Sequence, residues 1–432
     1  MRFDNLSDWL SWQETLHFTA VDPGLDRVGE VWQRLTSLEK LPFTVITIAG
    51  TNGKGSSVAL LESILRAAGY RIGSYTSPHL LRYNERICIN NLPCSDGEIC
   101  QSFAKIDGAR EDISLTYFEF ATLAAMDIFC QQDLDVVILE VGMGGRLDAV
   151  NLFDADIALI TPISLDHTNW LGNNRETIAA EKAGVLRAGQ SVVCSESSPS
   201  MSVKDRAEEL KAKCYIAEQD FFVTKRQHDW DWHNEQFNYS KLPLPALIGD
   251  YQIQNAAAVL QIVSLLNQSE FNIDISAIKT GLQTVKLAGR FQIIDGEVER
   301  IFDVTHNHQG ACNLAELLAE KNSSGQTRAV LAMLKDKDVS AVIEPLKSII
   351  DQWYIAGLNG SRGLSGDDLS NKIKTIVGEG KTFSHTVVEE AYQQAMLESK
   401  PNDRVLIFGS FHTVEAVMRL IPEYFSKEEN DE

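Results

Sequence analysis

FTVITIAGTNGKGSSVALLESILRAAG, residues 43–69, is the stretch of sequence that decides the fold. Residues 43–49 form a short apolar run rich in β-branched side chains, which is typical of a buried strand. Residues 57–68 carry leucine and isoleucine at helical spacing and stop before Gly69, so we expect a helix there. A glycine-rich loop that joins a strand to a helix is typical of phosphate-binding α/β domains.

The loop from Gly50 to Ser56 contains the groups that a bound phosphate requires. Its glycines allow backbone N–H groups to turn towards an anion, and the helix N-terminus adds partial positive charge. Lys54 can reach the outer phosphates of a nucleotide, and Ser56 or Ser57 can offer a hydroxyl to Mg²⁺. The strict pattern GxxxxGK[ST] is not met, because Gly55 separates Lys54 from Ser56. The strand–loop–helix setting nevertheless favours a phosphate site over a plain turn.

A second apolar strand, DVVILE, ends on Glu140. A carboxylate at the end of a buried strand is where P-loop enzymes hold Mg²⁺. Polar residues also follow other expected strands: Ser77, Pro78 and His79, then Asp166 and His167, then Asp303 and His306. Open α/β sheets bind ligands beyond the carboxyl ends of their strands, so these groups predict one shared site between two domains.

Strands and helices alternate along most of the chain, which predicts parallel sheets covered by helices on both faces. Beyond the first stretch, we expect strands at 71–75, 135–141, 157–163 and 191–195, and helices at 118–130, 176–186, 252–266 and 275–286. Residues 220–245 break this alternation and are interpreted as a β excursion or a loop. A fresh alternation begins near Gly289, with strands expected at 300–304, 329–333, 353–357 and 405–408. We therefore expect two domains, 1–288 and 289–432.

Composition narrows the possible partners of this chain. Its 432 residues carry a formal net charge of −21, which argues against a protein that coats nucleic acid or an anionic membrane. The N-terminal residues do not resemble a signal peptide, and no apolar run is long enough for a transmembrane helix. The seven cysteines include no CxxC pair, so we expect a reduced, cytoplasmic protein.

Motifs spread over nearly the whole chain resemble those of the Mur ligase superfamily, and within it the bifunctional bacterial folylpolyglutamate synthase/dihydrofolate synthase family. The motifs are ITIAGTNGKGS, YTSPHLLRYNERI, ILEVGMGGRLDAVN, LDHTNWLG, AAEKAGVLR, LAGRFQ, FDVTHN, AMLKDKD and FGSFHTVEAVM. AGTNGKGS alone would indicate only the superfamily, whereas the ordered set is specific to the family.

The resemblance implies an α/β fold with a P-loop-containing N-terminal domain, whose mostly parallel sheet is of the Mur ligase central-domain type, and a smaller Rossmann-like C-terminal domain. It implies an ATP-dependent ligase that adds L-glutamate to dihydropteroate, giving dihydrofolate, and to reduced folates, giving folylpolyglutamates, through an acyl phosphate. A carboxylate that attacks a triphosphate brings like charges together, so Mg²⁺ and basic side chains are required near the reacting atoms. We expect these small molecules as partners, no nucleic acid or membrane, and a monomer.

The family pattern also assigns nucleotide and metal ligands. It places the ATP phosphates at Thr51, Asn52, Gly53, Lys54, Gly55 and Ser56, with further nucleotide contacts at Asn255, Arg290 and Asp303. It places two Mg²⁺ ions at Ser77, Glu140, His167 and Lys182. Lys182 matches the lysine that these ligases carry as a carbamate, although the sequence alone would make it an ordinary helix lysine. The expected catalytic residues are Lys54, Glu140, His167 and Lys182.

The pterin side of the expected site rests on three segments. They contain Thr15, Leu16, His17 and Phe18, then Thr116, Tyr117, Phe118 and Glu119, then Leu147, Asp148 and Ala149. Packing and helix capping are equally good explanations for the first two segments. His306 and Ser410 are candidates for binding the incoming glutamate. The chain departs from the family pattern at His308, which replaces a common proline, at Ser56, which replaces threonine, and at Lys335, where family members vary.

The alternatives to this function are a peptidoglycan-precursor ligase and a nucleotide-switch or ATP-driven binding protein. A peptidoglycan-precursor ligase usually carries an extra N-terminal domain, and only about 40 residues precede the first expected strand, too few to form one. A nucleotide switch specific for guanine would show NKxD after a strand, whereas Asn371 and Lys372 lie within a helical stretch. An ATP-driven machine with arginines supplied in trans remains open at the level of sequence.

Overall fold

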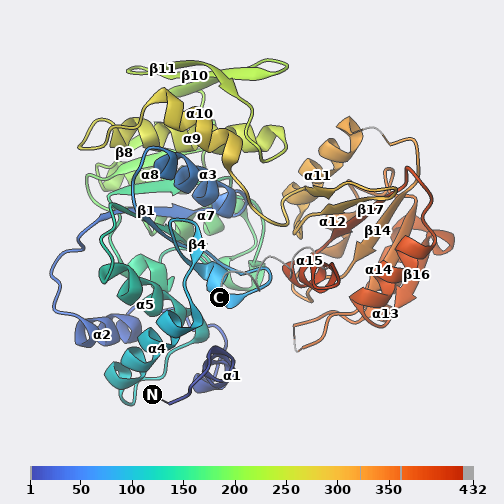
Figure 1. Cartoon of the computed structure of the whole chain (residues 1–432), viewed down its shortest axis with the longest axis horizontal. Coiled ribbons are helices and arrows are strands. Elements are labelled where there is room, and N and C mark those ends of the chain that lie inside the picture. The colour runs from blue at the N-terminus through green and yellow to red at the C-terminus, as the bar shows by residue number, and fades with distance from the viewer. Residues whose placement is uncertain (1, 322, 361, 422–432) are drawn as a thin grey trace.

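The computed structural model describes residues 2–321, 323–360 and 362–421. Two α/β units lie side by side (Figure 1), and we call the one with strands β1–β11 the first unit and the one with β12–β17 the second unit. The strand of the deciding stretch, β1 (Thr44–Ala49), lies inside an eight-stranded sheet between β5 (Val136–Glu140) and β6 (Ile157–Ile160). Both neighbours pair with β1 in parallel, so their carboxyl ends meet at one edge.

The eight-stranded sheet has the order β4-β3-β2-β5-β1-β6-β7-β8. Its other strands are β2 (Ile72–Tyr75), β3 (Ile87–Ile89), β4 (Leu92–Pro93), β7 (Ser191–Cys194) and β8 (Lys213–Ile216). The run from β2 to β8 is parallel, as predicted, but β3 and β4 pair antiparallel at one edge, so the sheet is mixed. Asn90 and Asn91 turn between them at positive φ, which asparagine tolerates better than most residues.

Helices cover both faces of this sheet. Those before residue 220 are α1 (Leu6–Leu16), α2 (Asp26–Leu35), α3 (Lys54–Ala67), α4 (Asp96–Arg110), α5 (Tyr117–Cys130), α6 (Thr168–Leu171), α7 (Arg175–Ala183) and α8 (Met201–Glu209). The prediction placed the start of α3 at Ser57, and this was wrong by three residues. The helix starts at Lys54, because Gly53 at φ 90° provides the turn into it. None of the helices in the described ranges is long and apolar enough to cross a membrane.

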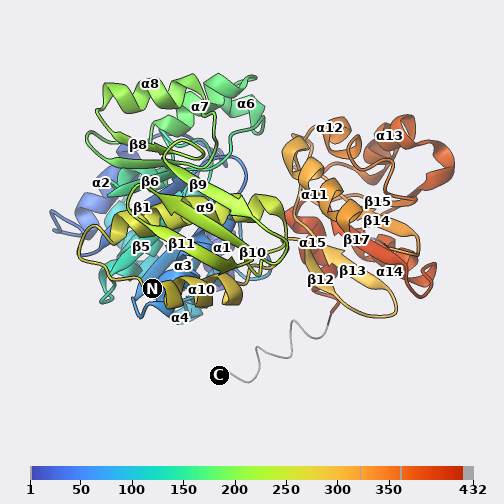
Figure 2. The same ribbon diagram turned by 90° about the horizontal axis from the view of Figure 1, so that it is seen from above.

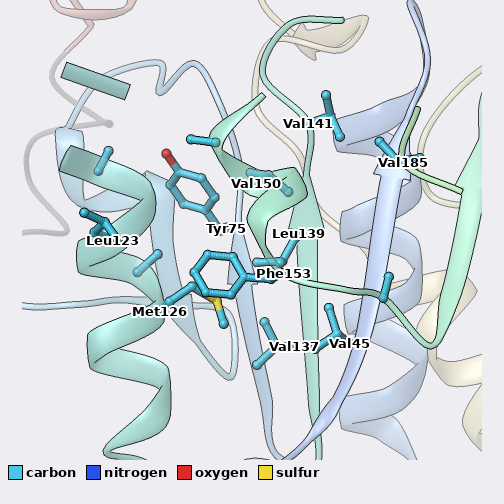
Figure 3. Packing of buried hydrophobic residues seen from close by; sticks show 14 of the residues in the cluster. Val45, Tyr75, Leu123, Met126, Val137, Leu139, Val141, Val150, Phe153 and Val185 are labelled. Carbon is cyan, nitrogen blue, oxygen red and sulfur yellow. The ribbon is translucent and has the colours of Figure 1, made fainter. Parts of the chain in front are cut away.

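The largest core of the first unit packs α5 against the sheet. Figure 3 shows Leu123 and Met126 of α5 beside Tyr75, Val137 and Leu139, which belong to β2 and β5. All five side chains are fully buried. Burying a side chain of this size contributes about 1.5–3 kcal/mol, so this packing fixes the carboxyl ends of β2 and β5. Both strand ends contribute to the site described below.

Residues 220–245, interpreted from sequence as a β excursion or a loop, form a three-stranded antiparallel sheet. Its strands are β9 (Phe221–Lys225), β10 (Asp229–Asn234) and β11 (Asn238–Pro243). Figure 2 shows this sheet lying over α9 (Asp250–Leu266), which is followed by α10 (Ile275–Thr284). Trp232 is fully buried, and its indole N–H donates to the Ala257 carbonyl of α9 at 3.1 Å. The excursion therefore covers the helix that carries Asn255.

The second unit contains a six-stranded sheet of order β12-β13-β17-β14-β15-β16. Its strands are β12 (Gln292–Ile294), β13 (Glu299–Phe302), β14 (Thr327–Leu331), β15 (Gln352–Ala356), β16 (Thr382–His385) and β17 (Arg404–Phe408). Its helices are α11 (His308–Glu320), α12 (Val339–Ile343), α13 (Gly366–Val377), α14 (Val388–Leu397) and α15 (Phe411–Met418). The four strands predicted here are present, and among the strands of the described residues in this sheet β12 alone pairs antiparallel.

Candidate active site between the two units

The phosphate-binding loop is anchored from behind and turns the start of α3 outward. The backbone N–H groups of Thr51 and Asn52 both donate to the Pro162 carbonyl, at 2.9 and 3.3 Å. The first helical hydrogen bond of α3 runs from the Ser57 N–H to the Gly53 carbonyl, at 2.9 Å. The preceding N–H groups have no acceptor inside the helix, and they concentrate partial positive charge at its N-terminus. This arrangement can bind an anionic phosphate.

Helix α9 contacts the loop at two positions, Gly53 and Ser56. A Cβ atom at Gly53 would lie 2.5 Å from the Asn255 Oδ1 atom, so only glycine fits there. The Gln252 side chain donates to the Ser56 Oγ at 3.3 Å and accepts from the Asn255 Nδ2 at 3.0 Å. Asn255, predicted as a nucleotide contact, therefore lies directly against the phosphate loop.

Lys54 and Glu140, predicted as partners, lie together. The Lys54 Nζ lies 3.9 Å from the Glu140 Oε1 and donates to the Thr51 carbonyl at 3.3 Å. The Ser77 N–H donates to the other carboxylate oxygen of Glu140 at 3.2 Å. Burial raises the pKa of Glu140, while the charge of Lys54 and the Ser77 N–H act in the opposite direction. The ends of β2 and β5 thus meet at the phosphate loop.

Lys182 is a buried residue, contrary to its appearance in the sequence as an ordinary helix lysine. Only 4 % of it is exposed, and its Nζ donates to the Gly50 carbonyl at 2.7 Å. Burial lowers the pKa of Lys182 to about 7, and the charge of Lys54 contributes to the same shift. A substantial fraction of its amine is therefore neutral near pH 7.

Asp166 joins the first unit to the second. Its carboxylate contacts the His306 Nε2 at 3.3 Å and the Lys337 Nζ at 2.5 Å, and both partners belong to the second unit. Burial opposes ionisation of Asp166, but the hydrogen bond and charge of His306 and the charge of Lys337 outweigh it and hold the pKa of this carboxyl well below its usual range. Burial lowers the pKa of the neighbouring His167 to about 4, so this imidazole is neutral and has a lone pair free to bind a metal.

A second contact between the units involves the phosphate loop itself. The Asn52 and Asn307 side-chain amides form a reciprocal pair at 3.2 and 2.9 Å, and the Asn52 Nδ2 also donates to Gln309 at 2.8 Å. Asn307 caps α11, which together with α15 faces the first unit (Figures 1 and 2). The predicted site therefore lies at the junction of the two units.

Arg290 and Asp303 contribute differently to this junction. Burial raises the pKa of Glu140, and the positive charge of Arg290 is one of those that lower it. Arg290 therefore faces the same site. Its guanidinium carbon lies 5.5 Å from the centroid of the Phe411 ring. The buried Asp303 carboxylate accepts two backbone N–H groups, at 2.8 and 2.9 Å, and thereby shapes the turn around it.

In the first predicted pterin segment, 15–18, Thr15 and Phe18 are exposed, and 85 % of the Phe18 surface is open to solvent. His17 is buried, and its ring nitrogens hydrogen-bond a serine hydroxyl at 2.8 Å and an aspartate at 3.1 Å. The Thr15 hydroxyl donates to a carbonyl of its own helix, and Leu16 packs against the core. Phe18 stacks near His17 with 4.4 Å between ring centroids.

The second pterin segment begins with a capping box. The Thr116 N–H donates to the Glu119 carboxylate at 2.7 Å, and the Glu119 N–H donates to the Thr116 hydroxyl at 3.2 Å. Glu119 also forms an ion pair with Arg27 at 3.0 Å, and Arg27 binds Asp22 at 2.6 Å. Helix capping, the alternative explanation for these two residues, is therefore present, and the network ties the first pterin segment to the start of α5.

The remaining pterin candidates lie in the loop that follows Glu140 or pack against it. A Cβ atom at Gly142 would lie 2.6 Å from the Phe118 ring, so this ring packs directly on the loop after β5. Asp148 accepts two backbone N–H groups, at 2.8 and 3.0 Å, and burial raises its pKa to about 6. Leu147 is half-buried and Ala149 is buried in the same loop.

Ser410 and His308 have ordinary roles at helix starts, whereas the other glutamate candidate, His306, pairs with an aspartate of the first unit. Ser410 caps α15, because its Oγ accepts the Thr413 N–H at 3.1 Å, and His306 contacts Asp166 as described above. His308 is the first residue of α11, and its Nδ1 donates to the Ala341 carbonyl at 2.9 Å. Proline is common at this helical position, which explains how the two residue types can replace each other.

Two residues of the site were missed from the sequence. Lys337 meets Asp166 across 171 positions of the chain, and it belongs to the motif AMLKDKD, which directly follows β14. Arg86 is buried, and its Nε donates to the His79 Nδ1 at 2.8 Å. The motif YTSPHLLRYNERI contains Arg86 and directly follows β2, so its position after a strand was an available signal.

Comparison with known proteins gives a consistent result. The Mur ligase middle domain matches residues 48–263, and the Mur ligase glutamate ligase domain matches residues 289–411. The chain is 43 % identical to the dihydrofolate synthase/folylpolyglutamate synthase of Escherichia coli (strain K12), over 96 % of this chain and 95 % of that protein. It is 30 % identical to the Bacillus subtilis protein of the same name, over 96 % and 99 % of the two chains.

Solved structures agree with these relatives. E. coli FolC in complex with DHPP and ADP superposes with a TM-score of 0.91 at 42 % identity, covering 98 % of both chains. A bifunctional folylpolyglutamate synthase/dihydrofolate synthase with Mn, AMPPNP and L-glutamate bound gives a TM-score of 0.88 at 44 % identity, covering 97 % of this chain and 98 % of that one. The fold, the phosphate loop and these similarities show that the chain belongs to the dihydrofolate synthase/folylpolyglutamate synthase family of the Mur ligases.

Proposed function

We propose that this protein is an ATP-dependent ligase that adds L-glutamate to dihydropteroate and to reduced folates through an acyl phosphate. The observation that carries the proposal is the meeting of the phosphate loop, Lys54 and Glu140 with Asp166, His306 and Lys337 at the junction of the units. Relatives at 43 and 42 % identity are named for these two activities. Because the chain belongs to the same family, these relatives support the same substrates for this protein.

The proposed chemistry begins when a substrate carboxylate attacks the terminal phosphate of ATP. Both reactants are anionic, so their approach requires neutralising charge and fixed positions. The start of α3 and Lys54 supply positive charge on the phosphate side, and Arg290 supplies it from the second unit. ADP leaves, and the neutral amine of glutamate then attacks the acyl phosphate, with loss of a proton and of phosphate.

Mg²⁺ fits the donors that lie here. The described His, Cys, Asp and Glu side chains form no group of three or more that could hold a metal by themselves, so hydroxyl, substrate or water oxygens would complete any site. Mg²⁺ prefers oxygen ligands and usually retains several waters, which suits the buried Glu140 carboxylate next to Ser77. The neutral His167 is a further donor. When bound, Mg²⁺ neutralises charge on the phosphates.

The carbamate on Lys182 is part of the proposal. A carbamate forms when a neutral amine attacks CO₂, and the lowered pKa of Lys182 keeps part of its amine neutral near pH 7. We expect a carbamate carbon signal in NMR spectra of protein equilibrated with ¹³C-bicarbonate. The signal should weaken below pH 7, where the amine gains a proton, and disappear in Lys182→Gln. The partly exposed Lys204→Gln is the matched control, and a signal that persists without Lys182 would contradict the assignment.

The pterin is proposed to lie between Phe118, Asp148 and the 15–18 segment. Its support is the packing of Phe118 on the loop after Glu140 and the exposure of Phe18. We also propose residues 1–288 and 289–432 as the two domains, acting as a monomer in the cytoplasm. The sheets on either side of residue 289 support that boundary, and light scattering tests the monomer.

The experiment that tests this function offers labelled L-glutamate and ATP with either dihydropteroate or a reduced folate. We expect ADP release only when glutamate and one pterin acceptor are both present, together with a labelled product. Product from one acceptor alone would restrict the function to one of the two activities. ATP turnover that requires neither substrate would contradict the ligase and favour an ATP-driven binding protein.

A further inference from the structure

Arg86 lies close to Glu140, although the expected reaction assigns it no role. It ends a short 3₁₀ turn, Tyr83–Arg86, in the segment after β2. The Arg86 carbonyl accepts the Thr76 N–H at 2.9 Å, and the next residue, Ser77, donates its own N–H to the Glu140 carboxylate at 3.2 Å. The backbone of Arg86 is therefore hydrogen-bonded to Thr76, and the residue after Thr76 binds Glu140.

The Arg86 side chain is held in place by aromatic rings. Its guanidinium carbon lies 5.5 Å from the ring centroids of both Tyr83 and Tyr117, and its Nε donates to the His79 Nδ1 at 2.8 Å. Only 8 % of Arg86 is exposed. Two flanking rings and one hydrogen bond restrict its rotamers, so the direction of its terminal nitrogens is largely fixed.

These terminal nitrogens are available to a ligand. In the described part of the chain, no carboxylate forms an ion pair with Arg86, and its Nη atoms have no hydrogen-bond acceptor. The buried side-chain atoms that lack a hydrogen-bond partner do not include these nitrogens. The Arg86 Nη atoms are therefore accessible to solvent. A largely buried guanidinium without a carboxylate is unfavourable unless an anion completes it.

The position of Arg86 is intermediate between the two proposed subsites. Tyr117, which flanks the guanidinium, is followed by Phe118, whose ring packs on Gly142 in the proposed pterin subsite. On the other side, the segment that carries Arg86 reaches Glu140 and the phosphate loop. A group between these subsites would contact the part of the acceptor that receives the phosphate.

We propose that Arg86 binds the carboxylate of the pterin acceptor, the group that ATP activates, and presents it to the phosphate loop. The inference rests on the proposed ligase function. Arginine suits this role because its planar fork can bind both oxygens of a carboxylate at once. Once one oxygen is phosphorylated, the guanidinium remains beside the acyl phosphate and can stabilise its charge.

The test removes the two proposed partners separately and together. Dihydropteroate and an analogue in which a neutral amide replaces the carboxylate are titrated, with AMPPNP present, into wild-type protein and Arg86→Gln. We expect wild-type protein to bind the neutral analogue about 10- to 100-fold more weakly than dihydropteroate, as is typical of a charged hydrogen-bonded pair. In Arg86→Gln, both ligands should bind about equally, and the Kd for AMPPNP should change less than about threefold.

Two further variants separate recognition from folding. Arg82→Gln alters a half-exposed arginine of the same segment and should keep the difference between the two ligands. Arg86→Lys keeps the charge without the fork and should show a reduced difference, which provides the readout if Arg86→Gln does not fold. Equal weakening of both ligands in the Arg86 variants, or weaker AMPPNP binding alone, would overturn this inference. Wild-type protein that binds neither pterin would overturn the proposed function as well.

Discussion

Lys54 is surrounded by groups whose protonation it influences. Burial dominates the pKa values of Glu140, His167 and Lys182, and in each case the positive charge of Lys54 contributes. One lysine therefore influences three ionisable groups of the phosphate subsite. Removing the Lys54 side chain should affect catalysis much more than folding, because this side chain lies in the site and not in a hydrophobic core.

We predict that Lys54→Met lowers kcat for ligation by about 10³-fold or more, since a fixed cation on the transferred phosphate is typically worth that much. The far-ultraviolet circular dichroism spectrum should remain that of the wild type. Lys105→Met, which removes an exposed ion pair with Asp127 on the outer helices, is the matched control. A kcat near the wild-type value in Lys54→Met would disprove the phosphate-site assignment.

His79 gives a prediction for the dependence of stability on pH. Burial and the charge of Arg86 lower the pKa of His79 to about 4, whereas an unfolded histidine titrates near 6.5. Between these values the unfolded chain binds a proton that the folded protein excludes, so the contribution of His79 is complete above pH 6.5 and is lost as the pH falls towards 4. At pH 5 the loss amounts to about 2 kcal/mol.

Urea unfolding at pH 7.5 and pH 5, with a chelator and without nucleotide, measures this loss. His79→Gln can still accept the hydrogen bond from Arg86, and it should lose about 2 kcal/mol less than the wild type on acidification. His228→Gln controls for removal of an exposed imidazole. Equal acid sensitivity of the wild type and His79→Gln would show that the ring is protonated in the folded protein.

Individual residues differ in how far the sequence reveals them. Lys54 and Glu140 were predictable, because each lies next to an apolar strand whose residues specify the surrounding fold. Lys182 was assigned only by resemblance, since its helix shows no sign that the lysine is buried against Gly50. Contacts such as Lys337 with Asp166 join distant segments, and tertiary packing alone determines them.

At the level of helices and strands, apolar content decided which elements were predictable. Central strands such as β1, β5 and β14 are mostly apolar and almost entirely buried, and all were predicted. The edge strands β8 and β16 were missed, because their residues are largely polar or partly exposed. Helices α1 and α2 were also missed, because each is short and buries only two or three side chains.

Two capping boxes of the same type allow a matched prediction for helix starts. Thr116 and Glu119 cap α5 in the buried network with Arg27, whereas Ser95 and Glu98 cap α4 at the surface. Losing the reciprocal cap costs about 1 kcal/mol in either helix. Glu119→Ala also leaves Arg27 without a buried ionic partner, which adds a further penalty.

We therefore expect Glu119→Ala to lower the free energy of unfolding by about 2–3 kcal/mol and Glu98→Ala by about 1 kcal/mol. Denaturant unfolding of both variants measures the difference. Arg27→Met should lower stability, and the double variant Arg27→Met/Glu119→Ala should lose less than the sum of the two single losses. Additive losses would show that the Arg27–Glu119 pair does not contribute to holding the two segments together.

On the scale of the whole molecule, the charge of −21 describes the surface and not the site. Lys54, Arg86 and Arg290 all act on Glu140, so the proposed anionic substrates meet three cations at this place. Two ion-pair partners of Asp166, His306 and Lys337, come from the second unit. The junction of the units is thus both part of the site and one of the contacts that hold it closed.

Lys337→Met should consequently open the molecule. Removing one partner of a buried ion pair costs about 3–5 kcal/mol, and each 1.4 kcal/mol changes a population ratio about tenfold. We expect a larger radius of gyration in small-angle scattering of the variant and faster proteolysis between α10 and β12. Lys347→Met, which breaks an exposed ion pair with Glu344 within the second unit, should leave both measurements unchanged. If Lys337→Met scatters like the wild type, the Asn52–Asn307 pair and the apolar contacts are sufficient to hold the units together. Asp166 would then act mainly in ligand binding.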